Sequence, residues 1–270
     1  MPELPEVETT AQGLRPLIVN HSVTSVGIYR PKLRWEIPEH LSTTLKNKTI
    51  QSVERRAKYL LVNFENGTLV LHLGMSGSIC VVPTDLPLKK HEHFELVFTN
   101  NTSLRLNDPR RFGAVLWQQI DKELSLFTKL GPEPLTETFN AEYLFHRAQG
   151  RVQNIKTFIM SNPVVVGVGN IYASESLFEA KISPKTPAGK ISIKRFQTLT
   201  QSIKNILSEA IERGGTTLKD FSSVDGKPGY FAQELSVYGR DNEPCKRCNG
   251  KIKKIIQNQR ASYYCPNCQK

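Results

Sequence analysis

The sequence predicts an α+β protein of more than one domain, because three kinds of signal follow one another along its 270 residues. An amphipathic segment opens the chain, and alternating strand patterns continue to about residue 118. Helical periodicity then replaces them, and two closely spaced cysteine pairs close the chain. We therefore expect an N-terminal helix flanking a β-sandwich, a helical domain, and a C-terminal β-hairpin stabilised by a metal ion.

The first predicted element is a helix from Glu3 to about Ile18. Pro5 suits the first turn of a helix, and the glutamates near the start complement the positive end of the helix dipole. Four apolar residues recur on one face at helical spacing: Val7, Ala11, Leu14 and Ile18. We expect this face to pack against the sheets that follow.

Strand signals dominate from about Ser22 to Gln118. Runs 59–64 and 68–73 flank Glu65-Asn66-Gly67, which is typical of a tight hairpin turn. Runs 94–99 and 103–107 flank a second turn, and residues 113–118 form a further strand. Strands at this spacing favour a sandwich of two sheets.

The pattern changes at Leu130-Gly131-Pro132-Glu133-Pro134, where we place a domain boundary. We expect an N-terminal domain over 1–130, a helical domain over 131–235 and a metal-binding segment over 236–270. Helices are predicted at about 141–148, 152–160, 171–180 and 193–213. In the last of these Ser192 would cap the start and Gly214-Gly215 the end. Its apolar stripe comprises Ile193, Phe196, Leu199, Ile203, Ile206, Ala210 and Ile211.

The four C-terminal cysteines have the spacing of a zinc site. Cys245 and Cys248 form one C-x2-C pair, and Cys265 and Cys268 form the second after sixteen intervening residues. Such pairs bend back onto one tetrahedral ion. The alternatives are two disulfides, or thiols without a role. The chain has one further cysteine and no export signal, which favours zinc.

The residues between the cysteine pairs predict a basic hairpin. Runs 251–256 and 260–264 read as strands that meet at Asn258-Gln259, with Arg260 near the tip. About 24 residues cannot bury enough apolar surface to fold unaided, so the metal would supply most of the folding free energy.

Charge and composition narrow the class of partner. Lys and Arg outnumber Asp and Glu by 36 to 25, giving a net charge of +11. Such an excess attracts polyanions, and nucleic acid is the commonest of them, although some proteins are simply basic. The chain has no apolar run near 18 residues and no apolar segment at its start. We therefore expect a cytoplasmic protein with no membrane partner.

The extreme N-terminus has the chemistry of a nucleophile. Removal of Met1 would leave Pro2 as a free secondary amine, and roughly a tenth of an α-amino group is neutral at pH 7. Its adduct with a sugar C1′ carbon is an iminium that keeps its positive charge as an electron sink. Glu3 could act as acid and then base, and Glu6 follows one helical turn later. Alternatively, the two acids are only dipole partners of the helix.

Motifs along the whole chain resemble those of bacterial formamidopyrimidine-DNA glycosylases. The first is Pro2-Glu3-Leu4-Pro5-Glu6-Val7-Glu8-Thr9, and the last is the four-cysteine hairpin. Each motif is weak alone, but their order and spacing are specific. Between them lie segments 55–60, 72–77, 108–113, 167–173, 225–231 and 237–240.

This resemblance implies a bifunctional DNA-repair enzyme that acts as a monomer on double-stranded DNA. It would excise oxidised purines such as 8-oxoguanine and formamidopyrimidines, process abasic sites, and cut the strand by β,δ-elimination. The glycine turn at 167–170 would belong to a helix–two-turns–helix motif, and one structural Zn²⁺ would be the cofactor. DNA binding would associate the protein with the bacterial nucleoid.

The resemblance also implies catalytic roles. Pro2 matches the family nucleophile, and Glu3 the carboxylate that protonates the sugar ring oxygen and moves the C2′ proton. Glu6 matches a second essential carboxylate. Lys58 matches a catalytic-site lysine, which we expect to start a strand; the alternative is an ordinary strand-edge lysine. We count Arg260 among both the catalytic and the DNA-binding residues.

Further positions match residues that contact DNA. Met75, Arg110 and Phe112 match the set that fills the gap left by an extruded nucleotide, with core packing as the alternative for Met75 and Phe112. His72 and Asn170 match phosphate contacts, and Asn170 would also be a helix N-cap. The loop 216–230 would cap the extruded base or else be a disordered connector, which makes Lys219 and Tyr238 secondary candidates.

Two other functions remain open at this point. An enzyme similar to endonuclease VIII, which acts on oxidised pyrimidines, would share the N-terminal amine and the zinc hairpin. A non-catalytic zinc-ribbon protein would bind DNA without needing a free Pro2. One departure from the family pattern is Asn249, where glycine is usual. We expect the zinc turn to survive because Asn tolerates left-handed backbone angles.

Overall fold

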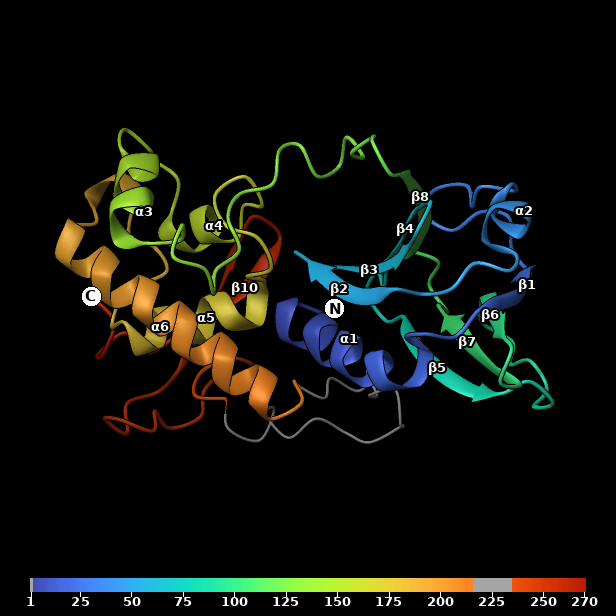
Figure 1. Ribbon diagram of the computed structural model, residues 1–270. Coiled ribbons are helices and arrows are strands. Elements are labelled where there is room, and N and C mark those ends of the chain that lie inside the picture. Colours follow the sequence, from blue (N-terminus) through green and yellow to red (C-terminus); the bar gives the residue numbers. More distant parts are fainter. Residues whose placement is uncertain (1, 216–234) are drawn as a thin grey trace. The chain divides into compact units, whose positions relative to one another are not determined.

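The computed structural model describes residues 2–215 and 235–270. These residues form two compact units, the first holding 2–128 and 213–215 and the second 129–212 and 235–270. Figure 1 labels the elements of both. The predicted division into three domains stays a prediction, since the helices and the cysteine hairpin lie in one unit here.

The chain opens with α1 (Leu4–Ile18), as predicted. Its apolar stripe is fully buried, with Val7 1% exposed and Ala11, Leu14 and Ile18 not exposed at all. Glu3 is the N-cap residue, and its extended backbone keeps Pro2 outside the helix. The helix therefore buries one face while it fixes the position of the N-terminus.

The predicted β-sandwich is confirmed as two four-stranded antiparallel sheets (Figure 1). One sheet has the order β2–β3–β4–β8, and the other has the order β1–β6–β7–β5. The predicted turn at Glu65 and Asn66 joins β3 to β4. The elements of this unit after α1 are β1 (Val23–Ile28), α2 (Leu41–Leu45), β2 (Ser52–Arg56), β3 (Tyr59–Phe64), β4 (Gly67–His72), β5 (Ser78–Pro83), β6 (Glu92–Phe98), β7 (Thr102–Asn107) and β8 (Ala114–Gln119).

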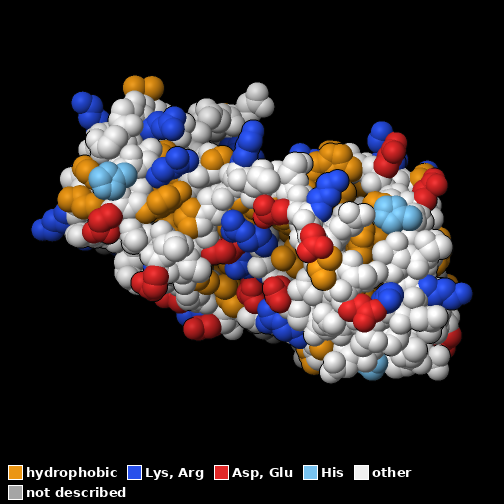
Figure 2. All heavy atoms as spheres, turned by 45° about the horizontal axis from the view of Figure 1, so that its top comes forward, with side chains coloured by type: hydrophobic (Ala, Val, Ile, Leu, Met, Phe, Trp, Pro, Cys, Tyr) orange, Lys and Arg blue, Asp and Glu red, His pale blue; other side chains and the backbone are white. Residues whose placement is uncertain are grey.

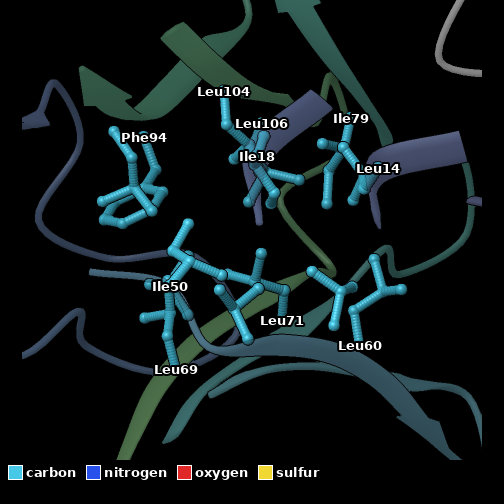
Figure 3. Packing of buried hydrophobic residues seen from close by; sticks show 14 of the residues in the cluster. Leu14, Ile18, Ile50, Leu60, Leu69, Leu71, Ile79, Phe94, Leu104 and Leu106 are labelled. Carbon is cyan, nitrogen blue, oxygen red and sulfur yellow. The ribbon is translucent and has the colours of Figure 1, made fainter. Parts of the chain in front are cut away.

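The two sheets and α1 share one hydrophobic core (Figure 3). Leu14 and Ile18 of α1 lie against side chains from both sheets. The labelled strand residues of the core are Leu60, Leu69, Leu71, Ile79, Phe94, Leu104 and Leu106. All the residues of this core belong to the first unit.

Helices build most of the second unit. They are α3 (Ala141–Ala148), α4 (Ile155–Ile159), α5 (Asn170–Glu179), the short 3-10 helix η1 (Ala188–Lys190) and α6 (Ile193–Glu212). Gly214 and Gly215 end α6 with positive φ angles, as predicted. Three positions of the predicted stripe are not buried: Ile193 is 37% exposed, and Ile206 and Ile211 are half-buried. Leu207, which was not predicted, is fully buried because it continues the face of Phe196 and Ile203.

The C-terminal hairpin pairs β9 (Lys253–Gln257) with β10 (Arg260–Tyr264). The turn residues Asn258 and Gln259 both adopt positive φ angles, which matches the twist of a two-residue hairpin. The hairpin shares a small hydrophobic cluster with the end of α5: Phe178, Val237, Cys245, Ile252 and Cys265.

Charged side chains of both signs lie on the face of the molecule that Figure 2 draws. The face in Figure 2 shows Lys and Arg side chains interspersed with acidic ones. Among the described residues, no helix combines the length and the apolar character that crossing a membrane would require.

Candidate functional site

Several predicted site residues lie at one end of the sheet β2–β3–β4–β8. The register pairs Tyr59 with His72 and His72 with Ala114. The β2–β3 turn, the end of β4 and the start of β8 therefore lie side by side. Lys58, His72 and the segment before Ala114 come together there, although they are well separated in the sequence.

The start of α1 is tied to the same end of this sheet. Arg55 at the end of β2 donates from Nε to Glu8 Oε2 of α1 at 2.9 Å, and from Nη1 to the Ala57 carbonyl at 3.0 Å. This guanidinium thus connects the first turns of α1 to the turn that carries Lys58.

Glu3 and Glu6 form a capping box at the N-terminus of α1. The Glu3 amide donates to Glu6 Oε2 at 2.8 Å, and the two residues are only 2% and 1% exposed. Glu6 therefore holds the backbone of Glu3, and Pro2 is buried beside them. The dipole alternative correctly places both acids at the helix start, but it does not account for their burial, which carboxylates avoid unless they have specific partners.

We had expected Lys58 to start a strand. It lies instead in the two-residue turn between β2 and β3. Ala57 before it has a left-handed φ of 55°, and its carbonyl accepts the hydrogen bond from Arg55. A turn held in this way fixes the backbone from which the lysine side chain extends.

His72 is held as a neutral imidazole. The Gly74 amide donates to its Nδ1 at 2.9 Å, which leaves Nε2 to carry the proton. Burial, followed by the nearby charges of Lys58 and Arg34, lowers the pKa of His72 to about 4. The centre of its ring also lies 4.9 Å from that of Tyr59. His72 can therefore donate one hydrogen bond without contributing positive charge.

The core-packing alternative for Met75 and Phe112 is wrong, because the two side chains are 39% and 45% exposed. Arg110 lies 5.1 Å from the centre of the Phe112 ring, so these two side chains neighbour each other. Their loops pack closely: a Cβ on Gly74 would lie 2.6 Å from the Gly113 nitrogen. The absence of a side chain at Gly74 thus brings the Met75 loop against the Phe112 loop.

Asn170 occupies the first turn of α5 in the second unit, but Gly169 is the N-cap, so the predicted capping role of Asn170 was wrong. Its Oδ1 accepts from Lys156 Nζ at 2.6 Å. The same ammonium donates to the Ala261 carbonyl and to Ser262 Oγ, each at 2.8 Å. Since Lys156 occupies the carboxamide oxygen, the amide NH₂ of Asn170 is the group that can meet an anion.

Tyr238 lies next to Asn170. The Asn170 Nδ2 donates to the Tyr238 hydroxyl at 3.4 Å. Glu175 of α5 holds this segment, because its carboxylate accepts from the amides of Ser236, Val237 and Tyr238 at 2.8, 3.0 and 2.8 Å. Burial raises the pKa of Glu175, and the three amides oppose that shift.

Arg260 is exposed at the start of β10, directly before the carbonyl of Ala261 that binds Lys156. The structure therefore gathers Asn170, Tyr238 and Arg260 in the second unit around one buried lysine. Lys219 and the loop 216–230 lie outside the described residues.

The four C-terminal cysteines form the metal centre. Their sulfur atoms all lie within 4.8 Å of one another, with Cys245 and Cys268 at 3.9 Å and Cys248 and Cys265 at 3.5 Å. A tetrahedral zinc with bonds of about 2.3 Å requires sulfurs about 3.8 Å apart. All five cysteines of the chain are described and none is in a disulfide. The four thiolates fit one structural Zn²⁺, and Asn249 adopts the expected left-handed φ, at 58°.

Sequence reasoning missed Lys156, Glu175 and Arg34. Lys156 and Glu175 are ionisable residues within apolar helical segments, a signal that could have marked them as buried. Arg34 lies in the basic, aromatic segment Arg30–Trp35. Its positive charge acts to lower the pKa of both His72 and Tyr59.

Sequence comparisons identify the family. The formamidopyrimidine-DNA glycosylase N-terminal domain matches residues 1–115, and the H2TH domain of the same glycosylases matches residues 130–222. A zinc finger found in FPG and IleRS matches residues 242–270. The chain belongs to the formamidopyrimidine-DNA glycosylase family.

Individual relatives agree over the full length. The formamidopyrimidine-DNA glycosylase of Ruthia magnifica subsp. Calyptogena magnifica is 58% identical over 269 residues, covering 100% of both chains. That of Hydrogenovibrio crunogenus is 53% identical, covering 100% of this chain and 97% of its own.

Solved structures show the same fold. Lactococcus lactis Fpg, in a complex with DNA containing an abasic site, is similar with a TM-score of 0.93 and 34% identity over 99% of both chains. The MutM (Fpg) protein of Thermus thermophilus has a TM-score of 0.88 and 35% identity, covering 99% of this chain and 98% of its own. These names favour the purine enzyme over the alternative similar to endonuclease VIII.

Proposed function

We propose that this protein excises oxidised purines from double-stranded DNA and then cleaves the strand at the resulting abasic site. The observation that carries the proposal is the N-terminus, where Pro2 directly precedes a buried carboxylate held in a capping box. A zinc-ribbon protein that only binds DNA needs no such arrangement. The family membership and the abasic-site complex of the Lactococcus lactis relative support a DNA substrate.

Pro2 is the nucleophile once Met1 has been removed. Its neutral nitrogen attacks C1′, and the glycosidic bond breaks as the base departs with the electron pair and takes up the proton that the proline nitrogen releases. Glu3 donates a proton to the sugar ring oxygen as the ring opens, which gives an iminium between Pro2 and C1′. Because proline is a secondary amine, this adduct has no N–H to lose and stays cationic.

The cationic iminium then drives strand cleavage. Glu3, now a carboxylate, removes a proton from C2′, and the 3′ phosphate leaves in the β-elimination. A second elimination releases the 5′ phosphate, and water finally hydrolyses the iminium to free Pro2. The Glu6 carboxylate positions Glu3 by accepting a hydrogen bond from the Glu3 backbone amide. The Lys58 ammonium binds a phosphate or the departing base.

DNA binding divides between contacts to phosphate and contacts to the base stack. His72, Asn170 and Arg260 bind phosphates, with the α5 N-terminus adding its dipole at Asn170. Met75, Arg110 and Phe112 enter the stack and hold the duplex open while the damaged nucleotide is extruded. Tyr238 and Lys219 are secondary contacts to the extruded nucleotide.

The hairpin presents Arg260 because zinc holds its base. Cys245, Cys248, Cys265 and Cys268 would bind the ion, whose role is structural. Free thiolates require a reducing compartment, which supports a cytoplasmic protein that associates with the nucleoid through DNA and acts as a monomer.

Borohydride trapping tests the proposal. Incubation with a duplex containing 8-oxoguanine and borohydride should yield a covalent protein–DNA adduct, because the reductant converts the iminium into a stable amine. A Pro2→Gly variant whose N-terminus is extended should yield none. An adduct with a duplex containing an oxidised pyrimidine but not with the 8-oxoguanine duplex would instead favour the enzyme similar to endonuclease VIII.

A further inference from the structure

The turn that carries Arg110 and Phe112 is closed by a single carboxylate. Asp108 is fully buried, and its Oδ1 accepts from the Arg111 amide at 3.0 Å. Its Oδ2 accepts from the Gly113 amide at 2.7 Å. Residues 109–112 are all exposed, so the carboxylate binds the backbone of a turn whose side chains face solvent.

Within this turn Arg111 adopts a left-handed φ of 57°. A residue with a Cβ adopts that conformation only at an energetic cost, so something must hold it there. Its amide donates to Asp108 Oδ1 at 3.0 Å and to the Asp108 backbone carbonyl at 3.2 Å, and both hydrogen bonds hold this conformation. The reversal at Arg111 lets Arg110 and Phe112 neighbour each other, with the guanidinium carbon 5.1 Å from the ring centre.

Both ends of the turn are fixed to the sandwich. The Asp108 amide donates to the His91 carbonyl at 2.9 Å, and the Asp108 carbonyl accepts from His93 Nε2 at 3.1 Å. At the other end the Gly113 carbonyl accepts from the Arg34 amide at 3.1 Å. A Cβ on Gly113 would lie 2.7 Å from the His72 carbonyl, so that end is also closely packed. Asp108 is the group that joins the two fixed ends across the exposed middle.

We propose that Asp108 is a positioning residue for nucleotide extrusion, acting by keeping the Arg110–Phe112 turn in the shape that enters the base stack. This inference rests on the proposed function. A side chain that separates stacked bases must be held rigidly, because the stack otherwise closes around the gap. Single-stranded DNA has no opposite strand to hold open, so the chemistry on it does not need the turn.

The test compares duplex and single-stranded substrates in the Asp108→Asn variant. Asparagine replaces one accepting oxygen with an NH₂ group that cannot accept, so one of the two backbone amides loses its side-chain acceptor. We expect excision of 8-oxoguanine from a duplex to slow at least tenfold. Borohydride trapping on a single-stranded abasic oligonucleotide should stay within twofold of the wild type. The fluorescence rise of 2-aminopurine placed beside the lesion, which reports unstacking, should also fall.

Two control substitutions distinguish a positioning role of Asp108 from a non-specific effect on the fold. Asp121→Asn changes an exposed acid in the turn after β8 and should alter none of the readouts. In a Phe112→Ala background, Asp108→Asn should add less than a twofold effect on the duplex, since the turn no longer carries its ring. If thermal melting shows that Asp108→Asn is unfolded, Asp108→Ser carries the test, because its hydroxyl still accepts from one amide.

Equal losses on duplex and single strand, or no loss on either, would overturn the inference. Failure of the wild-type protein to form any trapped adduct would instead overturn the proposed function. In that case the 2-aminopurine signal on bound duplex still decides the role of Asp108: an unchanged signal in the variant counts against it, and a reduced one supports it.

Discussion

His72 illustrates how one backbone hydrogen bond sets the chemistry of a side chain. The Gly74 amide occupies Nδ1, so the ring donates through Nε2 and remains neutral at physiological pH. The same bond holds the loop that carries Met75. Protonation of His72 would remove the acceptor for the Gly74 amide, so the charge state of the ring and the shape of the loop are linked.

We therefore predict a titration midpoint of about 4 for His72, far below its ordinary value. The unfolded chain binds this proton below about pH 6.5, whereas the folded one does not until about pH 4. The contribution of His72 to the free energy of unfolding is therefore fully present above pH 6.5 and is lost as the pH falls toward 4. Nitrogen-15 NMR of the labelled ring measures both midpoint and tautomer. A midpoint near 6.5, or a proton on Nδ1, would contradict this assignment.

At the scale of elements, α5 connects the phosphate-binding and zinc-binding parts of the second unit. It begins at Asn170, carries Glu175 in its middle, and packs Phe178 at its end against Cys245 and Cys265. Lys156 of α4 adds a second connection, since it binds Asn170 together with two backbone or side-chain oxygens of β10. One buried ammonium thus aligns Asn170 with the strand that carries Arg260.

We predict that Lys156→Met weakens duplex binding roughly tenfold without changing its salt dependence. The substitution leaves one buried and two part-buried acceptors without their ammonium, which costs about 2–4 kcal/mol of stability in total. Lys156 itself is 2% exposed and releases no counterion on binding. Fluorescence anisotropy across a salt series, with a duplex containing an abasic analogue, measures both quantities.

Arg260→Ala is the matched comparison, because Arg260 is exposed and in our proposal binds a phosphate. It should lower the slope of log affinity against log salt by about one unit. If Lys156→Met lowered the slope by the same amount, Lys156 would be a phosphate ligand rather than the group that aligns Asn170.

Local sequence signals predicted much of the fold. The stripe of α1, the hairpin turns and the cysteine spacing each depend on neighbours in sequence, and the structure confirms them. Residues with distant partners were not predictable in this way. Arg105 sits in the middle of β7 and is 3% exposed, because Glu95 and Glu92 of β6 bind it at 2.7 and 3.4 Å.

The candidate site follows the same rule. Individual residues matched a family pattern, but the contacts that hold those residues in place could not be predicted from the sequence. Lys156 and its partner Ser262 are 106 residues apart, and Glu175 lies 61 residues from Ser236. Such pairs form only once the fold brings their elements together. Lys58 was misplaced at a strand start because the turn at Ala57 needs a left-handed φ that alanine rarely adopts.

At the scale of the whole molecule, the described core of the sandwich and the cluster that includes two of the zinc-binding cysteines belong to different units. The sandwich buries its own cluster from α1 and both sheets. The zinc hairpin instead shares its small cluster with α5. Loss of zinc should therefore destabilise the helices around α5 but leave the sandwich folded.

We predict that chelating zinc abolishes DNA binding while the sandwich stays folded. Hydrogen exchange followed by mass spectrometry should show lost protection in residues 242–270 and reduced protection in α5. Protection of β3, β4, β6 and β7 should persist. Restoring zinc should restore both protection and binding. Loss of protection throughout the chain, or intact DNA binding after complete zinc removal, would contradict the division into separate cores.

The identity of the nucleophile is best tested by mapping the trapped bond. After reaction with the 8-oxoguanine duplex and borohydride, proteolysis and mass spectrometry should locate the sugar remnant on the backbone nitrogen of Pro2, in a peptide that lacks Met1. A remnant on a lysine side chain such as Lys58, or an active protein that keeps Met1, would contradict the account.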